Sequence, residues 1–423
     1  MANVLFVTRQ YFPHGDATSQ VVHHLAGEFL NRGWDVRVLA MTNQPEDVEI
    51  REWEGVQVDY ACLPGSMDRE QFKTGLKRDF FRTVISAGKL FFSMMGRKNE
   101  GLGLVMNPLG REALGKKISE IQHTGKIDFC IATLMPAEAA GAARDALDEG
   151  TVFAVYQLDT FWNNESLQAK HLENRKQFEK RLTERADFVV TTPLIRRANE
   201  AVFPEYKEKL ISAEFPMIRE AELPVDSDRV YKDGQTHCAF LGRLYKSFRP
   251  PERMVRMMLR MEEKEGAGPV FDFYGTGQHL IRAELEKEKK HADSIQLHGA
   301  VQSAEARRIM GSADFLVNID NTTTLLVPSK IFEYISTGKP LINFYFNGDS
   351  PTLGYLERYP NCVNVYLYGE PGAEIKKLEA FIHTAKGRRI PFSEVRELYR
   401  ENTPEYVCDL FCREYDSAKG RQP

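Results

Sequence analysis

Two short apolar runs, Phe315–Ile319 and Leu341–Tyr345, with a helical pattern between them at 329–337, restrict the fold of this 423-residue chain more than any other segment. Gly338 and Pro340 follow the helical pattern directly, where glycine favours the end of a helix and proline forbids its continuation. A strand, a helix and a second strand in this order predict a parallel sheet that helices cover on both faces.

Three polar side chains, Ser329, Lys330 and Glu333, stand at the start of the predicted helix, which faces the carboxyl edge of the sheet. Unpaired backbone N–H groups and the helix dipole favour an anion there, so Ser329 can donate to a phosphate oxygen and Lys330 supplies a positive charge. Glu333 lies one turn further on, where a carboxylate can accept both ribose hydroxyls. The pattern predicts a nucleotide diphosphate site; the alternative is an ordinary helix with an i,i+3 ion pair.

Strand and helix patterns alternate along the whole chain. The first series opens with an apolar strand from Asn3 to Thr8, a helix from about Ser19, with Ser19 as its N-cap, and a strand from Val36 to Ala40. From about Glu214 to Gly234 the pattern gives way to a Pro- and charge-rich passage, and a second series begins at Cys238. We therefore predict an α/β protein with two doubly wound, Rossmann-like domains that face each other across a cleft.

The expected boundaries follow from where each series starts and ends. We expect an N-terminal domain at 1–215, a linker at 216–234 and a C-terminal domain at 235–395 that carries the nucleotide site. A last helix within 396–423 has an apolar stripe with which it can pack back on the first domain.

Composition excludes several classes of protein. The net charge of −4 gives no general attraction to nucleic acid, so an anionic ligand must be held by local charge. The six cysteines are scattered, which predicts reduced thiols and no disulfide framework or metal site. The first apolar run is too short for a signal peptide, and no run of about 18 apolar residues occurs. These features predict a cytoplasmic protein that does not span a membrane.

The loop after the strand at 238–241 carries three cations, Arg243, Lys246 and Arg249, beside a glycine that allows close backbone approach. Such a loop would neutralise a diphosphate leaving group, and the rigid fork of arginine suits phosphate oxygens better than lysine does. The alternative is an ordinary solvated loop. The turn at 273–277 lacks the third glycine of the dinucleotide fingerprint, which argues against a nicotinamide cofactor.

These motifs occur in the order FVTRQYFPHG, FLGRLYKSFRPPE, FYGTGQ, LHGAV and VPSKIFEYISTGKPLI, an order that resembles the GT-B glycosyltransferases of the large retaining family 4. The resemblance covers nearly the whole chain. It implies a hexosyltransferase with a nucleotide diphosphate sugar as donor, a UDP-sugar being favoured, and with neither metal nor other cofactor. It places Glu333 on the donor ribose and Arg243 and Arg249 on the diphosphate. The remaining donor-binding residues that it implies are Gly15 and the backbone of Gly299, Ala300 and Val301.

One departure from that family concerns the sugar of the donor. Leu325 stands where the family has the first glutamate of an E-x7-E pair. Its contact with the sugar hydroxyls is then missing, or is made by Asp320, Asn321 or Thr322 on the same loop.

No catalytic base can be assigned from the sequence. Relatives often carry a histidine near the end of an N-terminal strand, and here His14, Glu138 and Asp159 are the candidates, each with ordinary structural polarity as the alternative. In a retaining displacement the leaving phosphate can take the acceptor proton, so Arg243 and Lys330 are predicted to act catalytically by stabilising leaving-group charge.

Residues 71–98 interleave lysines and arginines with phenylalanines and methionines, and Asp79 is their only acid. This composition predicts contact with an anionic bilayer or with a lipid-linked acceptor. The alternative is that helices pack their aromatic side chains on the first domain and leave a solvated basic face.

The sequence therefore predicts a class of donor and a class of acceptor. The donor is a nucleotide sugar, and the acceptor is the hydroxyl of a glycan or lipid-linked molecule, used in polysaccharide or glycoconjugate biosynthesis at the inner face of the membrane. Two alternatives remain open. One is a nucleotide-sugar 2-epimerase with the same fold, which acts without an acceptor. The other is a glycan-binding or scaffolding relative without catalytic activity.

Overall fold

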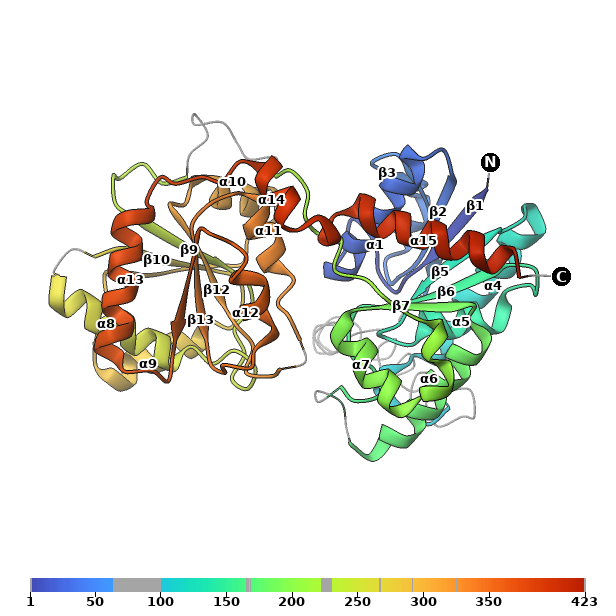
Figure 1. Cartoon of the computed structure of the whole chain (residues 1–423), viewed down its shortest axis with the longest axis horizontal. Helices are drawn as coiled ribbons and strands as arrows, with labels where there is room; N and C mark the ends of the chain where they lie inside the picture. Colours follow the sequence, from blue (N-terminus) through green and yellow to red (C-terminus); the bar gives the residue numbers. More distant parts are fainter. Residues whose placement is uncertain are drawn as a thin grey trace. The chain divides into compact units, whose positions relative to one another are not determined.

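The computed structural model describes residues 2–63, 100–164, 167, 169–221, 230–265, 268–290, 292–324 and 326–421. The chain divides into two compact units (Figure 1): unit 1 comprises Met1–Pro216 and Glu401–Pro423, and unit 2 comprises Met217–Arg400. The basic aromatic segment at 71–98 and Leu325 lie outside the described residues.

Unit 1 is built on one sheet with the strand order β3-β4-β2-β1-β5-β6-β7-β8. Its pairings are parallel except that β3 runs antiparallel to β4. The strands are β1 (Asn3–Val7), β2 (Asp35–Thr42), β3 (Glu52–Trp53), β4 (Val56–Cys62), β5 (Phe129–Thr133), β6 (Val152–Gln157), β7 (Phe188–Thr191) and β8 (Leu210–Ser212). The α-helices are α1 (Ala17–Asn31), α4 (Pro108–Thr124), α5 (Glu138–Ala146), α6 (Leu172–Arg185), α7 (Pro193–Val202) and α15 (Pro404–Lys419).

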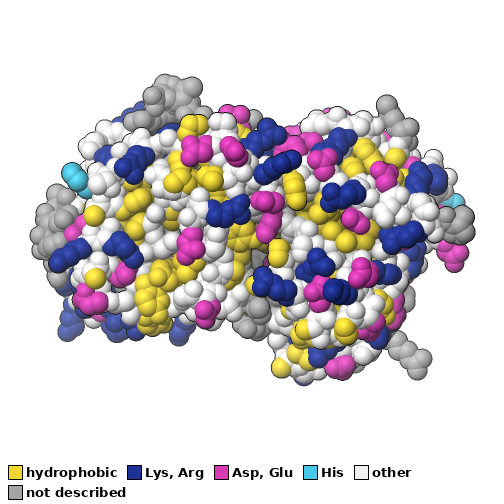
Figure 2. All heavy atoms as spheres, in the orientation of Figure 1, with side chains coloured by type: hydrophobic (Ala, Val, Ile, Leu, Met, Phe, Trp, Pro, Cys, Tyr) yellow, Lys and Arg dark blue, Asp and Glu magenta, His cyan; other side chains and the backbone are white. Residues whose placement is uncertain are grey.

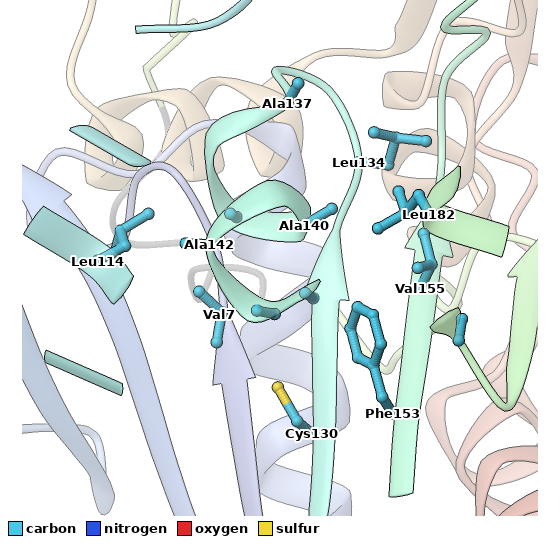
Figure 3. Packing of buried hydrophobic residues seen from close by; sticks show 14 of the residues in the cluster. Val7, Leu114, Cys130, Leu134, Ala137, Ala140, Ala142, Phe153, Val155 and Leu182 are labelled. Carbon is cyan, nitrogen blue, oxygen red and sulfur yellow. The ribbon is translucent and has the colours of Figure 1, made fainter. Parts of the chain in front are cut away.

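The core of unit 1 lies between the sheet and its helices. Figure 3 shows Val7, Cys130 and Phe153 from three neighbouring strands beside the alanines of α5, among them Ala140 and Ala142. These side chains are fully buried or nearly so. Small alanines let α5 approach the strands closely, and the large apolar side chains of the strands fill the space between them.

The start of α1 corrects one sequence expectation. The N-cap of α1 is Asp16, whose carboxylate accepts from the Ser19 N–H, while the Ser19 hydroxyl accepts from the Asp16 N–H. Ser19 is therefore the third helical residue of a capping box and not the N-cap. The helix starts earlier than predicted because aspartate satisfies the exposed N–H groups of the first turn.

The C-terminal helix α15 belongs to unit 1, where it contacts α1 and β6. Its aromatic side chains pack on the sheet: the Tyr415 ring lies 5.1 Å from that of Phe129, and the Phe411 ring lies 5.2 Å from that of Tyr156. Arg32 of α1 adds a 2.6 Å ion pair with Asp409. The last part of the sequence thus completes the unit that the first part begins.

Unit 2 contains a parallel sheet with the order β11-β10-β9-β12-β13-β14. The strands are β9 (His237–Leu241), β10 (Val270–Tyr274), β11 (Ile295–Gly299), β12 (Phe315–Ile319), β13 (Leu341–Tyr345) and β14 (Cys362–Tyr366). The α-helices are α8 (Glu252–Glu265), α9 (His279–Glu288), α10 (Ser303–Ser312), α11 (Lys330–Ser336), α12 (Pro351–Leu356), α13 (Pro371–Ala385) and α14 (Phe392–Leu398). The strand order reverses between β9 and β12, which makes this the topological switch point where α/β sheets bind ligands.

Two further observations concern the surface. Within the described ranges, no helix has the length and apolar character needed to cross a bilayer. Figure 2 shows Lys and Arg side chains interspersed with Asp and Glu over the visible face, without a continuous patch of either sign. This distribution agrees with the small net charge of −4.

Candidate functional site

The predicted donor residues of unit 2 lie on loops that leave the carboxyl ends of four neighbouring strands. The loops follow β11, β10, β9 and β12, in the order of the sheet, and they begin at Ala300, Gly275, Gly242 and Asp320. Because parallel strands end at the same edge, the structure brings the cation-rich loop after β9 next to the loop that leads into α11. Both loops border the switch point.

Glycines allow these loops to pack closely. Gly275 has a φ of 120°, and a Cβ at this position would collide with the carbonyl oxygen of Gly242. The Gly275 N–H donates to the Gly299 carbonyl at 2.6 Å, and the Gly242 N–H donates to the Tyr274 carbonyl at 2.9 Å. The turn that lacks a dinucleotide fingerprint therefore serves to join the loops after β9, β10 and β11.

Arg243 and Arg249 have different surroundings on the loop after β9. The exposed Arg243 donates from Nε to the Thr276 hydroxyl at 2.9 Å, and its guanidinium lies 5.7 Å from the centre of the Tyr245 ring. Arg249 donates from Nη2 to Oδ1 of Asn321 at 2.8 Å. Its Nε is buried and has no hydrogen-bond partner in the described part of the chain, and burial lowers the pKa of Arg249. Lys246 is exposed on the same loop.

At the start of α11, Lys330 and Glu333 form an ion pair, with 2.5 Å between Nζ and Oε2. The pair is partly exposed, with 32% and 25% of the two side chains accessible. Ser329 is the N-cap of α11, and its side chain makes no capping hydrogen bond. The structure thus brings the three residues together as expected. The ion pair also fits the ordinary helical alternative, so the role of Glu333 stays a prediction.

Tyr334 is a residue whose role the sequence did not reveal. Its buried hydroxyl accepts from the Leu241 N–H at 3.1 Å and lies 3.2 Å from the Leu241 carbonyl, to which it donates. This contact fixes α11 to the end of β9, on the opposite side of the switch point. The only sequence signal was the place of Tyr334 directly after Glu333.

The loop after β12 gives the three proposed substitutes for the missing glutamate different roles. Asp320 is fully buried, and its carboxylate accepts from the hydroxyls of Ser350 and Thr352, so it does not reach a ligand. Asn321 holds Arg249, as described above. Thr322 donates from its hydroxyl to the Ser247 carbonyl at 2.9 Å. Each side chain therefore already has a partner within unit 2.

The loop expected to hold the base begins at the end of β11. Gly299 has a φ of 81°, and its N–H donates to Oε1 of Gln278 at 3.2 Å. Gln278 also donates to the carbonyls of Phe273 and Gly275, so it ties this loop to the one after β10. Ala300 and Val301 are at least partly exposed.

The other candidates belong to unit 1. His14 is exposed, with 62% of its side chain accessible, and its Nε2 lies 3.6 Å from Oδ1 of Asp47. Gly15 lies close to α1, because a Cβ at this position would come within 2.9 Å of the Ser19 Cβ. Both residues lie on the loop between β1 and α1.

Two carboxyls of unit 1 have raised pKa values. Burial, and to a smaller extent the charge of Asp16, raises the pKa of Asp159. Burial also raises the pKa of Glu138, whose Oε1 accepts from the Asn107 N–H at 2.8 Å. Its Oε2 has no hydrogen-bond partner among the described residues. Perturbed carboxyls of this kind are candidates for proton transfer.

Comparison with known proteins shows a likeness in fold and no match in sequence. It matches no protein-family model, and it matches no curated protein. Three solved structures illustrate the likeness in fold. A mutant of S. aureus TarM, in complex with Fondaparinux, alpha-GlcNAc-glycerol and UDP, has a TM-score of 0.60 and 11% identity over 99% of this chain and 100% of that chain. The catalytic domain of starch synthase IV from Arabidopsis thaliana, bound to ADP and acarbose, has a TM-score of 0.58 and 12% identity over 99% and 100%.

The third structure is a putative UDP-N-acetylglucosamine 2-epimerase from Listeria monocytogenes, with a TM-score of 0.57 and 9% identity over 100% of this chain and 97% of that chain. Identities this low establish the fold and nothing finer. The prediction of an α/β fold with two Rossmann-like parallel sheets is confirmed, and the chain has the GT-B fold.

Proposed function

We propose that this protein is a glycosyltransferase that transfers a sugar from a nucleotide diphosphate donor, with a UDP-sugar favoured, to a hydroxyl of a glycan or lipid-linked acceptor. The observation that carries the proposal is the group of cations at the switch point of unit 2. Arg249 presents a buried Nε that has no partner among the described residues, and Arg243, on the loop after β9, and Lys330, at the start of α11, lie at the same switch point. A diphosphate would supply negative charge to this group of cations and an acceptor oxygen to the Nε of Arg249.

The proposed chemistry is retaining displacement on the side of the leaving group. The bond between the anomeric carbon and the diphosphate oxygen breaks, the acceptor oxygen bonds to the same carbon, and the acceptor proton passes to the leaving phosphate. Negative charge grows on the diphosphate along this path, so cations placed beforehand stabilise the transition state more than the ground state. Arg243, Arg249 and Lys330 are proposed to supply this charge without a metal ion.

Glu333 is proposed to bind the donor ribose. On binding, its carboxylate would exchange the Lys330 ammonium for the two ribose hydroxyls, and Lys330 would turn to the phosphates. The backbone at Gly299, Ala300 and Val301 is proposed to hold the base.

The acceptor is proposed to be bound through unit 1, in the cytoplasm and at the inner face of the membrane. The support is the composition of residues 71–98, which lie outside the described residues. Reversal of three charges in this segment (Lys77, Arg78 and Arg82 to glutamate) would then abolish co-sedimentation with anionic vesicles and leave donor affinity intact.

A nucleotide-sugar 2-epimerase is the second candidate. An epimerase needs acid and base groups around the sugar ring, and unit 1 offers two carboxyls with raised pKa values, Asp159 and Glu138. A solved structure with this fold is named as a putative UDP-N-acetylglucosamine 2-epimerase.

One experiment separates these candidates. Thermal shift with ADP-, GDP- and UDP-sugars identifies the donor, because a ligand at about 100 times its Kd stabilises the protein by about 2.7 kcal/mol. The donor is then incubated with and without a mixture of glycan and lipid-linked acceptors. Nucleoside diphosphate released only with acceptor supports the transferase. Conversion of the donor sugar to its 2-epimer without acceptor supports the epimerase, and no binding of any donor supports a non-catalytic relative.

A further inference from the structure

We propose that Asn321 is the positioning residue of the diphosphate site: it holds the Arg249 guanidinium in place for phosphate, while hydroxyl groups keep the carboxylate of the neighbouring Asp320 from forming an ion pair with that guanidinium. The inference rests on the proposed function, because it assigns the diphosphate as the ligand of Arg249. The sequence offered Asn321 only as one of three candidates for a contact with the donor sugar, and the tertiary structure places it beside Arg249 instead.

Two of the three guanidinium nitrogens of Arg249 have hydrogen-bond partners within unit 2, and the third has none among the described residues. Nη2 donates to Oδ1 of Asn321 at 2.8 Å, and Nη1 donates to the Arg243 carbonyl at 3.4 Å. The Arg249 backbone is fixed as well, because its N–H donates to the Tyr245 carbonyl at 3.1 Å. Nε remains buried with no partner in the described ranges. A buried guanidinium N–H without an acceptor is costly, so the site favours a ligand that brings an oxygen.

Asn321 itself is fixed at three points. Its N–H donates to Oδ1 of Asp320 at 2.8 Å, its Nδ2 donates to the Leu326 carbonyl at 3.1 Å, and its Oδ1 accepts from Arg249. An amide with its donor and its acceptor both engaged has one orientation. Asn321 therefore presents an uncharged oxygen to the guanidinium, which orients Arg249 without forming an ion pair with it.

Asp320 explains why an uncharged partner matters. This carboxylate is fully buried and close enough to Arg249 to interact with it electrostatically. Its oxygens accept from the hydroxyls of Ser350 at 2.5 Å and of Thr352 at 2.7 Å, and from the Asn321 N–H. Ser350 and Thr352 belong to the start of α12, so α12 holds the carboxylate. Without these hydroxyls Asp320 would be drawn to Arg249, and the resulting ion pair would compete with phosphate.

The test is a double-mutant cycle on the full chain, read by calorimetry with ADP, GDP and UDP; the nucleotide that binds the parent is used throughout. We expect Asn321→Ala and Arg249→Ala each to weaken binding of that nucleoside diphosphate about 10-fold, the scale of a hydrogen bond to a charged group. In the Arg249→Ala background, Asn321→Ala should have no further effect, because Asn321 acts through Arg249. Loss of the same size in both backgrounds would overturn the proposal.

Two further variants serve as controls. Thr322→Val removes a hydroxyl from the same loop that does not touch Arg249, and we expect a change of about 2-fold at most. Asn321→Asp keeps the size of the side chain. It should weaken binding at least as much as Asn321→Ala does, because the new carboxylate neutralises Arg249. This variant decides the question if Asn321→Ala does not fold. Unchanged affinity in Asn321→Asp overturns the proposal. If the parent protein binds none of the three nucleotides, the proposed function itself is overturned. If the parent binds one of them and the Asn321 variants bind it equally well, only the role of Asn321 is overturned.

Discussion

Replacement of Glu333 distinguishes the two interpretations of its ion pair with Lys330. If the carboxylate binds both ribose hydroxyls, Glu333→Ala should weaken binding of the nucleoside diphosphate by about 1.5 to 3 kcal/mol, as for a charge-assisted hydrogen bond. The 2′-deoxy nucleotide should lose less affinity on this substitution, because one of the two hydroxyl contacts is already missing. Calorimetry with the two nucleotides measures this. Equal losses for both nucleotides would show that Glu333 serves only to hold Lys330.

The two exposed cations lead to a kinetic prediction. Arg243→Ala and Lys330→Ala should each lower kcat by about 100-fold and change KM less, because charge on the leaving diphosphate is largest in the transition state. Steady-state kinetics with the donor identified by thermal shift measure both constants. EDTA should leave turnover unchanged in the parent. If chelation stopped turnover and Mg²⁺ or Mn²⁺ restored it, the metal-free mechanism would be wrong.

Charge and position in the sequence were enough to find the cations, and tertiary contacts were needed for their partners. Arg243, Arg249 and Lys330 stand out because each follows the carboxyl end of a predicted strand. Asn321 and Tyr334 look like ordinary polar residues in the sequence. Their hydrogen bonds join residues 72 and 93 positions apart, a separation at which no local pattern carries information.

Among the elements, the turn after β10 is the one whose geometry most restricts the site. Gly275→Ala places a side chain at a φ of 120° and against the Gly242 carbonyl, so we expect destabilisation of about 2 to 4 kcal/mol. The displaced turn should also move Thr276 away from Arg243 and weaken nucleotide binding. Denaturant unfolding and calorimetry measure the two effects. Gly348→Ala is the matched control, because no atom lies within 4 Å of a Cβ there.

A second prediction concerns the loop after β6, which α6 and α7 hold through the buried Glu179. Its carboxyl accepts from the side chains of Gln157 and Asn199 and from the Trp162 N–H. Burial raises the pKa of Glu179 to about 7, although the three hydrogen bonds act to lower it. In the unfolded chain the carboxyl ionises near pH 4.3. Between those two values the folded state holds the extra proton, so its stability should fall as the pH rises.

We expect this carboxyl to remove on the order of 3 kcal/mol from the free energy of unfolding between about pH 4.3 and 7, the range in which only the folded state keeps the proton. Glu179→Gln, which cannot ionise, should lose that part of the pH dependence. Urea unfolding of parent and variant at several pH values in this range measures the difference. Parallel pH profiles would mean that Glu179 titrates normally in the folded protein.

Most elements could be predicted from the sequence because their apolar periods are clear. The five-residue strands β12 and β13 lie where the pattern placed them. Two short strands at the edges of unit 1 were not predicted, β3 with two residues and β8 with three, because segments of this length have no period. Asp16 and not Ser19 caps α1, since both residues are good N-caps and only the tertiary structure decides between them.

At the scale of the molecule, each unit has a hydrophobic core of its own, which makes the units separable by experiment. The main hydrophobic cluster of unit 2 lies between Cys238 and Ala385, and the unit is one continuous piece of chain. Unit 1 is discontinuous, because α15 supplies Phe411 and Tyr415 to its sheet. A break in the chain near Arg400 should therefore affect the two units differently.

We expect a fragment of residues 217–400 to fold alone and to bind the nucleoside diphosphate about as tightly as the full chain, since every proposed diphosphate ligand belongs to unit 2. Residues 1–400 should instead lose stability in unit 1, because removal of α15 exposes Phe129 and Tyr156 and leaves Arg32 without Asp409. Circular dichroism, thermal unfolding and calorimetry on both fragments measure these effects. A folded 217–400 fragment that binds about 100-fold more weakly than the full chain would place essential nucleotide contacts in unit 1, with Gly15 the first residue to test.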